Sequence, residues 1–307
     1  MAATSFRAIY DDHEFANDWD GAARAADPAR HAAALAAWDA WFPRRGDGPR
    51  YRRWRWGALC ECFLLDCRNY RSANDAPDGP AKTMLGAVQR RWLVDGLRAS
   101  TAPFKLVFSS VPLDFGNADD HWAAFADERD AILGELAAAR LAGMLWLSAD
   151  QHWFAAHQHR DRVREFQVGP LSRGLLTPPP PRPGVLTRVH EYNVGLIEIT
   201  AAPRLRFRAL GATGATLYDE AFTPADLALE PGGRSAGQQG PCTHTPQPQR
   251  RLGAGAVAGL FGMVLYAFAA GVLDLPSTVE LSGELDPGVV RMPEVGDFVG
   301  VIMPMRI

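Results

Sequence analysis

Gly143-Met144-Leu145-Trp146-Leu147-Ser148-Ala149-Asp150-Gln151-His152 is the stretch on which the fold prediction rests. Its apolar first part ends in small residues, a pattern typical of a buried β-strand. Asp150 and His152 follow at once, so the strand delivers two potential metal ligands to the place where a sheet meets solvent. Because Asp-x-His often occurs by chance, the pair predicts a metal site only if a second polar cluster supports it.

A second polar cluster follows the first apolar run of the chain. Phe6 to Tyr10 has the pattern of a short strand, and Asp12 and His13 come shortly after it, with Asn17 further on. Carboxylate, amide and imidazole groups suit hard or borderline divalent or trivalent metal ions. Two neighbouring ions held by both strand ends would activate a hydroxide and bind a phosphoryl group.

Helical and strand patterns alternate between the two clusters. Asp27 followed by Pro28 predicts the start of a helix that continues to Trp41. Residues 51–66 predict one strand or a hairpin. Further helices are predicted over residues 85–97 and 120–141, and buried strands over 104–109 and 143–150. This alternation predicts an α/β core with ligands gathered at strand ends.

Shorter strand patterns follow the Asp150 stretch and predict an antiparallel sheet. They cover residues 163–168, 184–190, 194–200 and 205–210. His157 and His159 precede these strands in a polar segment, and we expect them to be solvated loop histidines.

The C-terminal part of the chain predicts a membrane attachment. A Pro-, Gly- and Gln-rich linker is expected over residues 228–250, one transmembrane helix over 251–274 and a tail over 275–307. Residues 252–273 are 22 residues without a charge, long enough to cross a hydrocarbon core of about 30 Å. Half of them are Ala or Gly, so a buried soluble helix is the alternative. Arg250 and Arg251 favour a cytoplasmic position for the main domain.

Composition argues against several other classes of protein. The formal net charge of −3 and the isoelectric point near 6.2 give no basic surface for nucleic acid, so we expect no nucleic-acid partner. The four cysteines lack the paired spacing of a structural zinc site and are too irregular for a disulfide framework. The N-terminus has no basic region followed by an apolar core, so no secretory signal peptide is predicted.

Several blocks of the sequence resemble the PhoD-like alkaline phosphatase and phosphodiesterase family, part of the calcineurin-like metallophosphatases. Ile-Tyr-Asp-Asp-His-Glu-Phe-Ala-Asn-Asp at 9–18 is similar to its W-D-D-H-[DE] block with the following asparagine. Residues 64–71 are similar to its L-D-x-R-x-x-R block and residues 147–152 to its L-S-G-D-x-H block. Matches to L-G-x-x-Q-x-x-W-L, K-x-x-x-S-S-x-P and E-F-x-x-G-P-L lie at 85–93, 105–112 and 165–171.

The resemblance implies a metallophosphatase-type α/β/β/α sandwich over residues 1–227. It implies hydrolysis of a small-molecule phosphate ester, a monoester or a diester, by metal-bound hydroxide. By the same resemblance His13 is the catalytic histidine that faces the phosphate, and Asp12, Asp150 and His152 are metal ligands. Two metal ions are expected, drawn from iron, calcium, manganese and zinc.

Three further residues are candidates for substrate binding. They are Asn17, Arg68 and Arg71, which fall in the matching blocks. For the two arginines an ion pair with Asp66 is at least as good an explanation, because paired arginines commonly support loops.

One block of the family has no counterpart in this sequence. That block, a strand carrying Asp and then G-D-x-x-[DY], supplies aspartates that hold both metals, and the match here begins after it. We therefore expect an N-terminally truncated domain with weakened metal binding. The alternatives are a catalytically inactive or split-gene remnant acting as a membrane-tethered binding or structural module, and a chain completed by an upstream polypeptide.

Overall fold

The computed structural model describes residues 6–42, 46–114, 118–172, 174–232, 264–265 and 305–306. The largest sheet within these ranges has seven strands. Their spatial order is β2 (Arg52–Trp56), β3 (Cys60–Leu64), β4 (Phe104–Phe108), β5 (Met144–Ser148), β7 (Arg164–Gln167), β6 (Phe154–Gln158) and β8 (Val185–Val189). A second sheet runs in the order β11 (Thr216–Phe222), β10 (Arg204–Gly211), β9 (Asn193–Thr200) and β13 (Met305–Arg306). A small third sheet pairs β1 (Phe6–Arg7) with β12 (Val264–Leu265).

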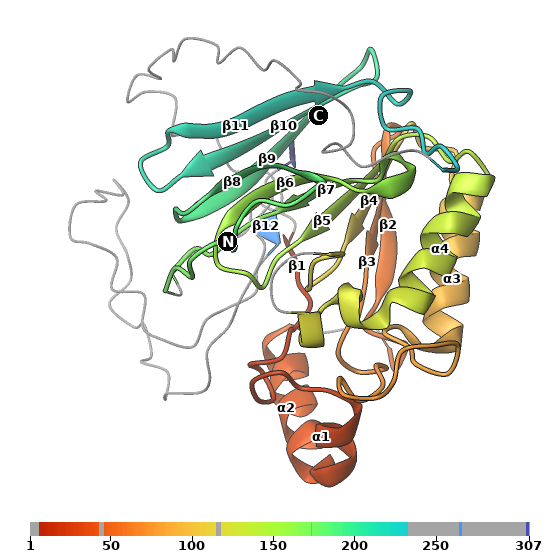
Figure 1. Cartoon of the computed structure of the whole chain (residues 1–307), viewed down its shortest axis with the longest axis vertical. Coiled ribbons are helices and arrows are strands. Elements are labelled where there is room, and N and C mark those ends of the chain that lie inside the picture. The colour runs from red at the N-terminus through yellow and green to blue at the C-terminus, as the bar shows by residue number, and fades with distance from the viewer. Residues whose placement is uncertain are drawn as a thin grey trace.

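The centre of the seven-stranded sheet is parallel and is covered by helices. Strands β3, β4, β5 and β7 run parallel to one another, and α3 (Gly86–Ala99) and α4 (Ala126–Ala138) lie side by side over one face (Figure 1). Every residue of β3, β4 and β5 is buried, as is usual for parallel strands covered on both faces. The carboxyl ends of these strands therefore meet at one edge of the sheet, where their loops can build a site.

The second sheet packs on the other face and completes a sandwich. The ring of Phe166 on β7 stacks on Phe207 of β10 with centroids 3.8 Å apart, and Phe154 and Phe222 belong to the same core. The layers are thus α/β/β, and no helix of the described ranges covers the outer face of the second sheet (Figure 1). Helices α1 (Gly21–Ala26) and α2 (Pro28–Trp41) lie at one end of the molecule instead.

Most elements agree with the sequence patterns, but several differ. The strands expected to form one antiparallel sheet are divided, because β7 and β8 join the seven-stranded sheet, where β7 runs parallel to β5, and only β9 and β10 pair in the second sheet. The strand expected over residues 6–10 covers only Phe6–Arg7. Asp27 caps α2 through its side chain, and residues 51–66 form the hairpin β2–β3. The helix expected from residue 120 begins at Ala126, because Ala118–Asp120 (η1) and Trp122–Phe125 (η2) form 3₁₀ turns first. The segment holding His157 is strand β6, paired with β7 and β8 on its two sides, so the loop prediction was wrong for His157, whereas His159 lies just beyond the strand and is partly exposed. That pairing, a short hairpin with β7 and a ladder with β8 further along the chain, buries His157.

The predicted membrane helix finds no support in the structure. No helix of the described ranges is long and apolar enough to cross a membrane. The prediction for residues 251–274 lies outside the described residues except for Val264–Leu265, which form a strand. Most of the predicted linker and tail also lies outside them, with Met305–Arg306 forming β13. The high Ala and Gly content of residues 252–273 gives only a weak drive for insertion.

Replacing Gly143 by Ala should destabilise the fold by more than about 2 kcal/mol. Gly143 has φ +73° at the entry to β5, and an added Cβ would lie 1.9 Å from the carbonyl oxygen of Pro103. Gly134 on α4 is the matched control, since a Cβ there meets nothing within 4 Å. Gly134→Ala should stabilise by about 0.5–1 kcal/mol. Urea unfolding followed by tryptophan fluorescence measures both, and equal stability of the two variants would contradict the close approach at Gly143.

Candidate functional site

A pocket of about 560 Å³ lies at the carboxyl end of β5. It contains five of the seven residues proposed for the site from sequence, namely Asp12, His13, Asn17, Asp150 and His152. The remaining lining residues are Asp18, Asp120, His121, Gln151, Gly174, Leu175 and Leu176. The strand-end argument therefore placed two segments more than a hundred residues apart at the same pocket.

Asp12 organises the turn that carries His13, Asn17 and Asp18. Its carbonyl oxygen accepts hydrogen bonds from the N–H groups of Phe15 and Ala16 at 2.8 and 2.9 Å. Its carboxylate oxygens accept from the N–H groups of His13 at 2.8 Å and Asp18 at 2.7 Å. These bonds hold the carboxylate in one orientation at the pocket and leave further lone pairs on each oxygen.

The segment after β5 has an unusual backbone. Asp150 has φ +71° and His152 has φ +49°, both in the left-handed region that residues other than glycine rarely occupy. Asp18, on the facing turn, also has a positive φ of 56°. Such conformations cost of order 1–3 kcal/mol each and cluster at functional sites. Their concentration around one pocket therefore favours a functional role for it.

His121 reaches Asp150 from the loop that follows β4. Its Nε2 lies 2.8 Å from Asp150 Oδ2, and the side-chain amide of Gln151 donates to the same oxygen at 2.9 Å. His121 is almost fully buried, and its Nδ1 has no hydrogen-bond partner among the described residues. Asp150 is thus oriented by a histidine that the sequence interpretation did not include.

Arg68 and Arg71 lie behind the pocket wall rather than in it. Arg68 makes bidentate contacts with Asp11, at 2.6 and 3.0 Å, and with Asp120, at 2.7 Å for both pairs. Arg71 Nη1 donates to Asp120 Oδ1 at 2.6 Å. Both guanidinium groups are fully buried, and neither residue lines the pocket. The structure therefore gives them a supporting position, and substrate contact by these arginines stays a prediction without support from the geometry.

The alternative considered for the two arginines, an ion pair with Asp66, was wrong. The carboxylate of Asp66 accepts hydrogen bonds from the hydroxyl of Tyr10 and from the backbone N–H of Asn69, the latter at 2.9 Å. The backbone N–H of Arg68 contacts it at 3.2 Å, but the guanidinium group does not. Asp66 serves the turn after β3, and this leaves the side chain of Arg68 to pair with carboxylates from other segments.

The carboxylates of the pocket differ in how readily they ionise. Burial raises the pKa of Asp12 to about 6, and the charges of Asp11 and Asp150 add to the rise while Arg68 opposes it. Burial alone would also raise the pKa of Asp150, but the hydrogen bond and charge of His121, together with Arg68, hold it below its ordinary value. Asp120 is likewise held low, because Arg68 and Arg71 outweigh its burial. Repulsion among these acids is therefore only partly relieved by protein cations.

Three overlapping groups of side chains, all from pocket-lining residues except Asp11, have ligand atoms close enough to hold a cation. In each group one ligand atom per residue lies within 4.8 Å of the others. The groups are Asp11–Asp12–Asp150, Asp120–His121–Asp150 and Asp12–Asp18–Asp120. Carboxylate oxygens with one imidazole suit hard or borderline ions such as calcium, manganese and iron. The donor set therefore fits the metal ions expected from sequence.

His152 differs from the other predicted ligands. It lines the pocket, but it belongs to none of these groups, and its Nδ1 lies 2.6 Å from the carbonyl oxygen of Gly174. A hydrogen bond of this kind fixes the orientation of the ring, as it does in many metal-binding histidines. Its role as a ligand stays a prediction.

Asp120 and His121 were the main omission of the sequence interpretation. The segment was assigned to a helix starting at residue 120, and an acidic residue at a helix start has a common capping explanation. Asp-His after a buried strand repeats the pattern of Asp12-His13, and that repetition was the available signal. The neighbouring acids Asp114 and Asp119 do not line the pocket.

Comparison with known proteins identifies the family of this chain. The family model described as PhoD-like phosphatase matches residues 1–223. Alkaline phosphatase D of Bacillus subtilis (strain 168) is 27% identical over a match covering 52% of this chain and 33% of that protein. A solved structure of PhoD aligns with a TM-score of 0.57 at 18% identity, over 74% of this chain and 56% of the other, which shows a shared fold. The chain thus spans about a third of the length of the curated relative, and it belongs to the PhoD-like phosphatase family.

Proposed function

We propose that this chain carries the phosphate-ester site of a metal-dependent hydrolase acting on small phosphomonoesters or phosphodiesters. The acidity of the pocket is the observation that carries the proposal. Four carboxylates, Asp12, Asp18, Asp120 and Asp150, line it together with three histidines. A phosphate ester is itself an anion, so such a pocket would repel it unless cations were bound there first.

The residues that would hold the metal ions are Asp12, Asp120 and Asp150, with His121 or His152 as nitrogen ligands. Bound ions would supply an activated water and offset the charge of the phosphoryl oxygens. The protein contributes orientation: backbone N–H groups fix Asp12, while His121 and Gln151 fix Asp150. Ligands held in this way lose little freedom when an ion binds.

His13 and Asn17 are proposed to act on the substrate. Both line the pocket on the turn that Asp12 organises. An imidazole there can donate a hydrogen bond to a phosphoryl oxygen or a proton to the departing alkoxide. The amide of Asn17 is a second donor for the phosphoryl group, although its Nδ2 now contacts Asp18 at 2.6 Å.

An inactive remnant is the less favoured alternative, because this chain alone brings several ligand groups to one pocket. We further propose that an upstream polypeptide segment adds ligands, as the family pattern implies. Attachment to a membrane through residues 251–274, with the main domain on the cytoplasmic side, stays a prediction from sequence.

Asp150→Asn should remove bound metal and lower hydrolysis of p-nitrophenyl phosphate and bis-p-nitrophenyl phosphate by about 100-fold or more. The amide keeps the shape of the side chain but loses the charge that attracts the cation. Metal analysis of the purified chain and initial rates with added manganese, calcium or iron measure the effect. Asp95→Asn on the exposed face of α3 is the matched control. A wild-type chain that binds no metal, and stays inert when an upstream family segment is added, would overturn the proposal.

Metal affinity should depend on pH through Asp12. Its raised pKa, about 6, means that the metal-free protein holds a proton there at lower pH, and an entering ion must displace it. Apparent affinity for manganese should therefore fall by up to about tenfold per pH unit below 6 and level off above it. The stability of the metal-free protein should depend on pH in the opposite direction. The stabilisation that the raised pKa of Asp12 contributes is lost as pH rises through 6. Manganese-binding titrations of the wild type and of Asp12→Asn between pH 5 and 8 test the prediction. If the affinity of the variant depended on pH as steeply as that of the wild type, the prediction would be contradicted.

Arg68→Met should lower the free energy of unfolding by about 3–5 kcal/mol, because it leaves Asp11 and Asp120 buried without their partner. The control is Arg98→Met, which breaks an exposed ion pair with Glu135 and should cost at most about 1 kcal/mol. Urea unfolding of the two variants measures the difference. If the two variants were equally stable and only Arg68→Met had a raised KM, the supporting role would be contradicted and the substrate-binding role expected from sequence would be favoured.

A further inference from the structure

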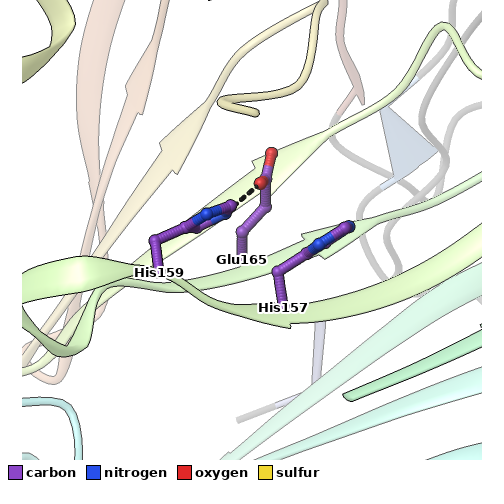
Figure 2. Close-up of side chains that lie close together, drawn as sticks. All are labelled: His157, His159 and Glu165. Carbon is purple, nitrogen blue, oxygen red and sulfur yellow. Dashed lines mark hydrogen bonds and ion pairs between the residues drawn. The ribbon is translucent and has the colours of Figure 1, made fainter. Parts of the chain in front are cut away.

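A second cluster of ligand-capable side chains lies on the seven-stranded sheet, outside the pocket. His157 on β6 is directly opposite Glu165 on β7 in the antiparallel register, and His159 follows His157 by two residues. Paired residues, and residues two apart along a strand, share a face of the sheet. The three side chains therefore project to the same side, as Figure 2 shows. None of them lines the pocket described above.

The three side chains are close enough to share one ion. One ligand atom from each lies within 4.8 Å of the other two. His159 Nε2 is 2.6 Å from Glu165 Oε2, and the two imidazole rings are nearly parallel with centroids 5.3 Å apart (Figure 2). This arrangement of a His-x-His strand segment with a carboxylate across the ladder needs only small movements to surround a cation.

Glu165 is held in place by bonds that leave one oxygen directed to the histidines. Its Oε1 accepts from the hydroxyl of Ser148 at 2.5 Å and from the backbone N–H of Leu113 at 3.1 Å. Its Oε2 contacts His159. Hydrogen bonds to the distal atom of a ligand are the usual means by which proteins orient metal-binding side chains.

We propose that His157, His159 and Glu165 form a second metal site, which takes a borderline divalent ion such as Zn²⁺. Two nitrogens and one carboxylate oxygen are typical zinc ligands, and three protein ligands leave a position for water. The pocket differs in being rich in oxygen ligands, which calcium and manganese prefer. The site does not depend on the proposed hydrolase activity.

The geometry requires one adjustment. Two ligands on a tetrahedral zinc lie about 3.4 Å apart, so the contact between His159 and Glu165 must widen from 2.6 Å. His159 lies just beyond the end of β6 and is partly exposed, while Glu165 is fully buried. The histidine is therefore the side chain that moves, and its exposure provides a path for the ion.

Metal binding to the full chain, without a histidine tag, tests the proposal. The variant Asp12→Asn with Asp150→Asn removes two ligands of the pocket and is stripped with chelator before use. Equilibrium dialysis should then show one equivalent of Zn²⁺ still bound. Co²⁺ should give the visible absorption of a four-coordinate site containing nitrogen ligands. Absence of both signals would overturn the proposal.

Histidine variants in the same background identify the ligands. His159→Gln keeps a hydrogen-bonding side chain next to Glu165 but should abolish the zinc equivalent and the cobalt spectrum. His157→Gln should do the same. His190→Gln, at an exposed position, is the matched control and should retain both. Near-ultraviolet circular dichroism reports folding, and His159→Gln decides the matter if the buried His157→Gln variant does not fold. If a folded His159→Gln variant still bound zinc, the proposal would be overturned, and the contacts in the cluster would be hydrogen bonds with a structural role only.

Discussion

The pocket depends on the buried guanidinium group of Arg68. It pairs with Asp11 from the segment after β1 and with Asp120 from η1, while its own backbone belongs to the turn after β3. Burying one such charge costs several kcal/mol, and that cost is offset only when geometry and hydrogen bonding are good. Four short contacts to two carboxylates meet this condition, since Arg presents its donors in a planar fork. Three distant segments are thereby held at one edge of the sheet.

The position of Arg68 also determines the charge of the pocket. Its donors face Asp11 and Asp120, and its charge also opposes the rise in the pKa of Asp12 and helps to hold the pKa of Asp150 low. Burial and repulsion from neighbouring carboxylates raise the pKa of Asp12, whereas Asp150 is kept ionised mainly by His121. The positive groups of the protein thus offset the negative charge of the pocket carboxylates only in part. A cation is the simplest group that completes such an arrangement.

The sequence predicted those features that local pattern controls. Asp27-Pro28 predicted the start of α2, the aromatic run predicted the β2–β3 hairpin, and the rule that polar side chains gather at strand ends predicted that Asp12 and Asp150 share one pocket. Pairing between distant segments lay beyond such rules. Nothing near Arg68 in the sequence identifies Asp120 as its partner, and nothing near His157 shows that β8 will pair with β6. Both errors arose because a polar residue was assigned from its neighbours in sequence.

The two carboxylate oxygens of Glu165 contact different parts of the structure. Oε1 holds Ser148, the last residue of β5, and the N–H of Leu113, on the loop that leads toward Asp120. Oε2 faces His159. A change at Glu165 would therefore disturb the support of Asp150, two residues after Ser148, as well as any ion at the cluster. The histidines lie on the side of Oε2, and their ring contacts with Glu165 do not involve β5. Replacing a histidine therefore tests metal binding without disturbing the pocket, whereas replacing Glu165 would affect both.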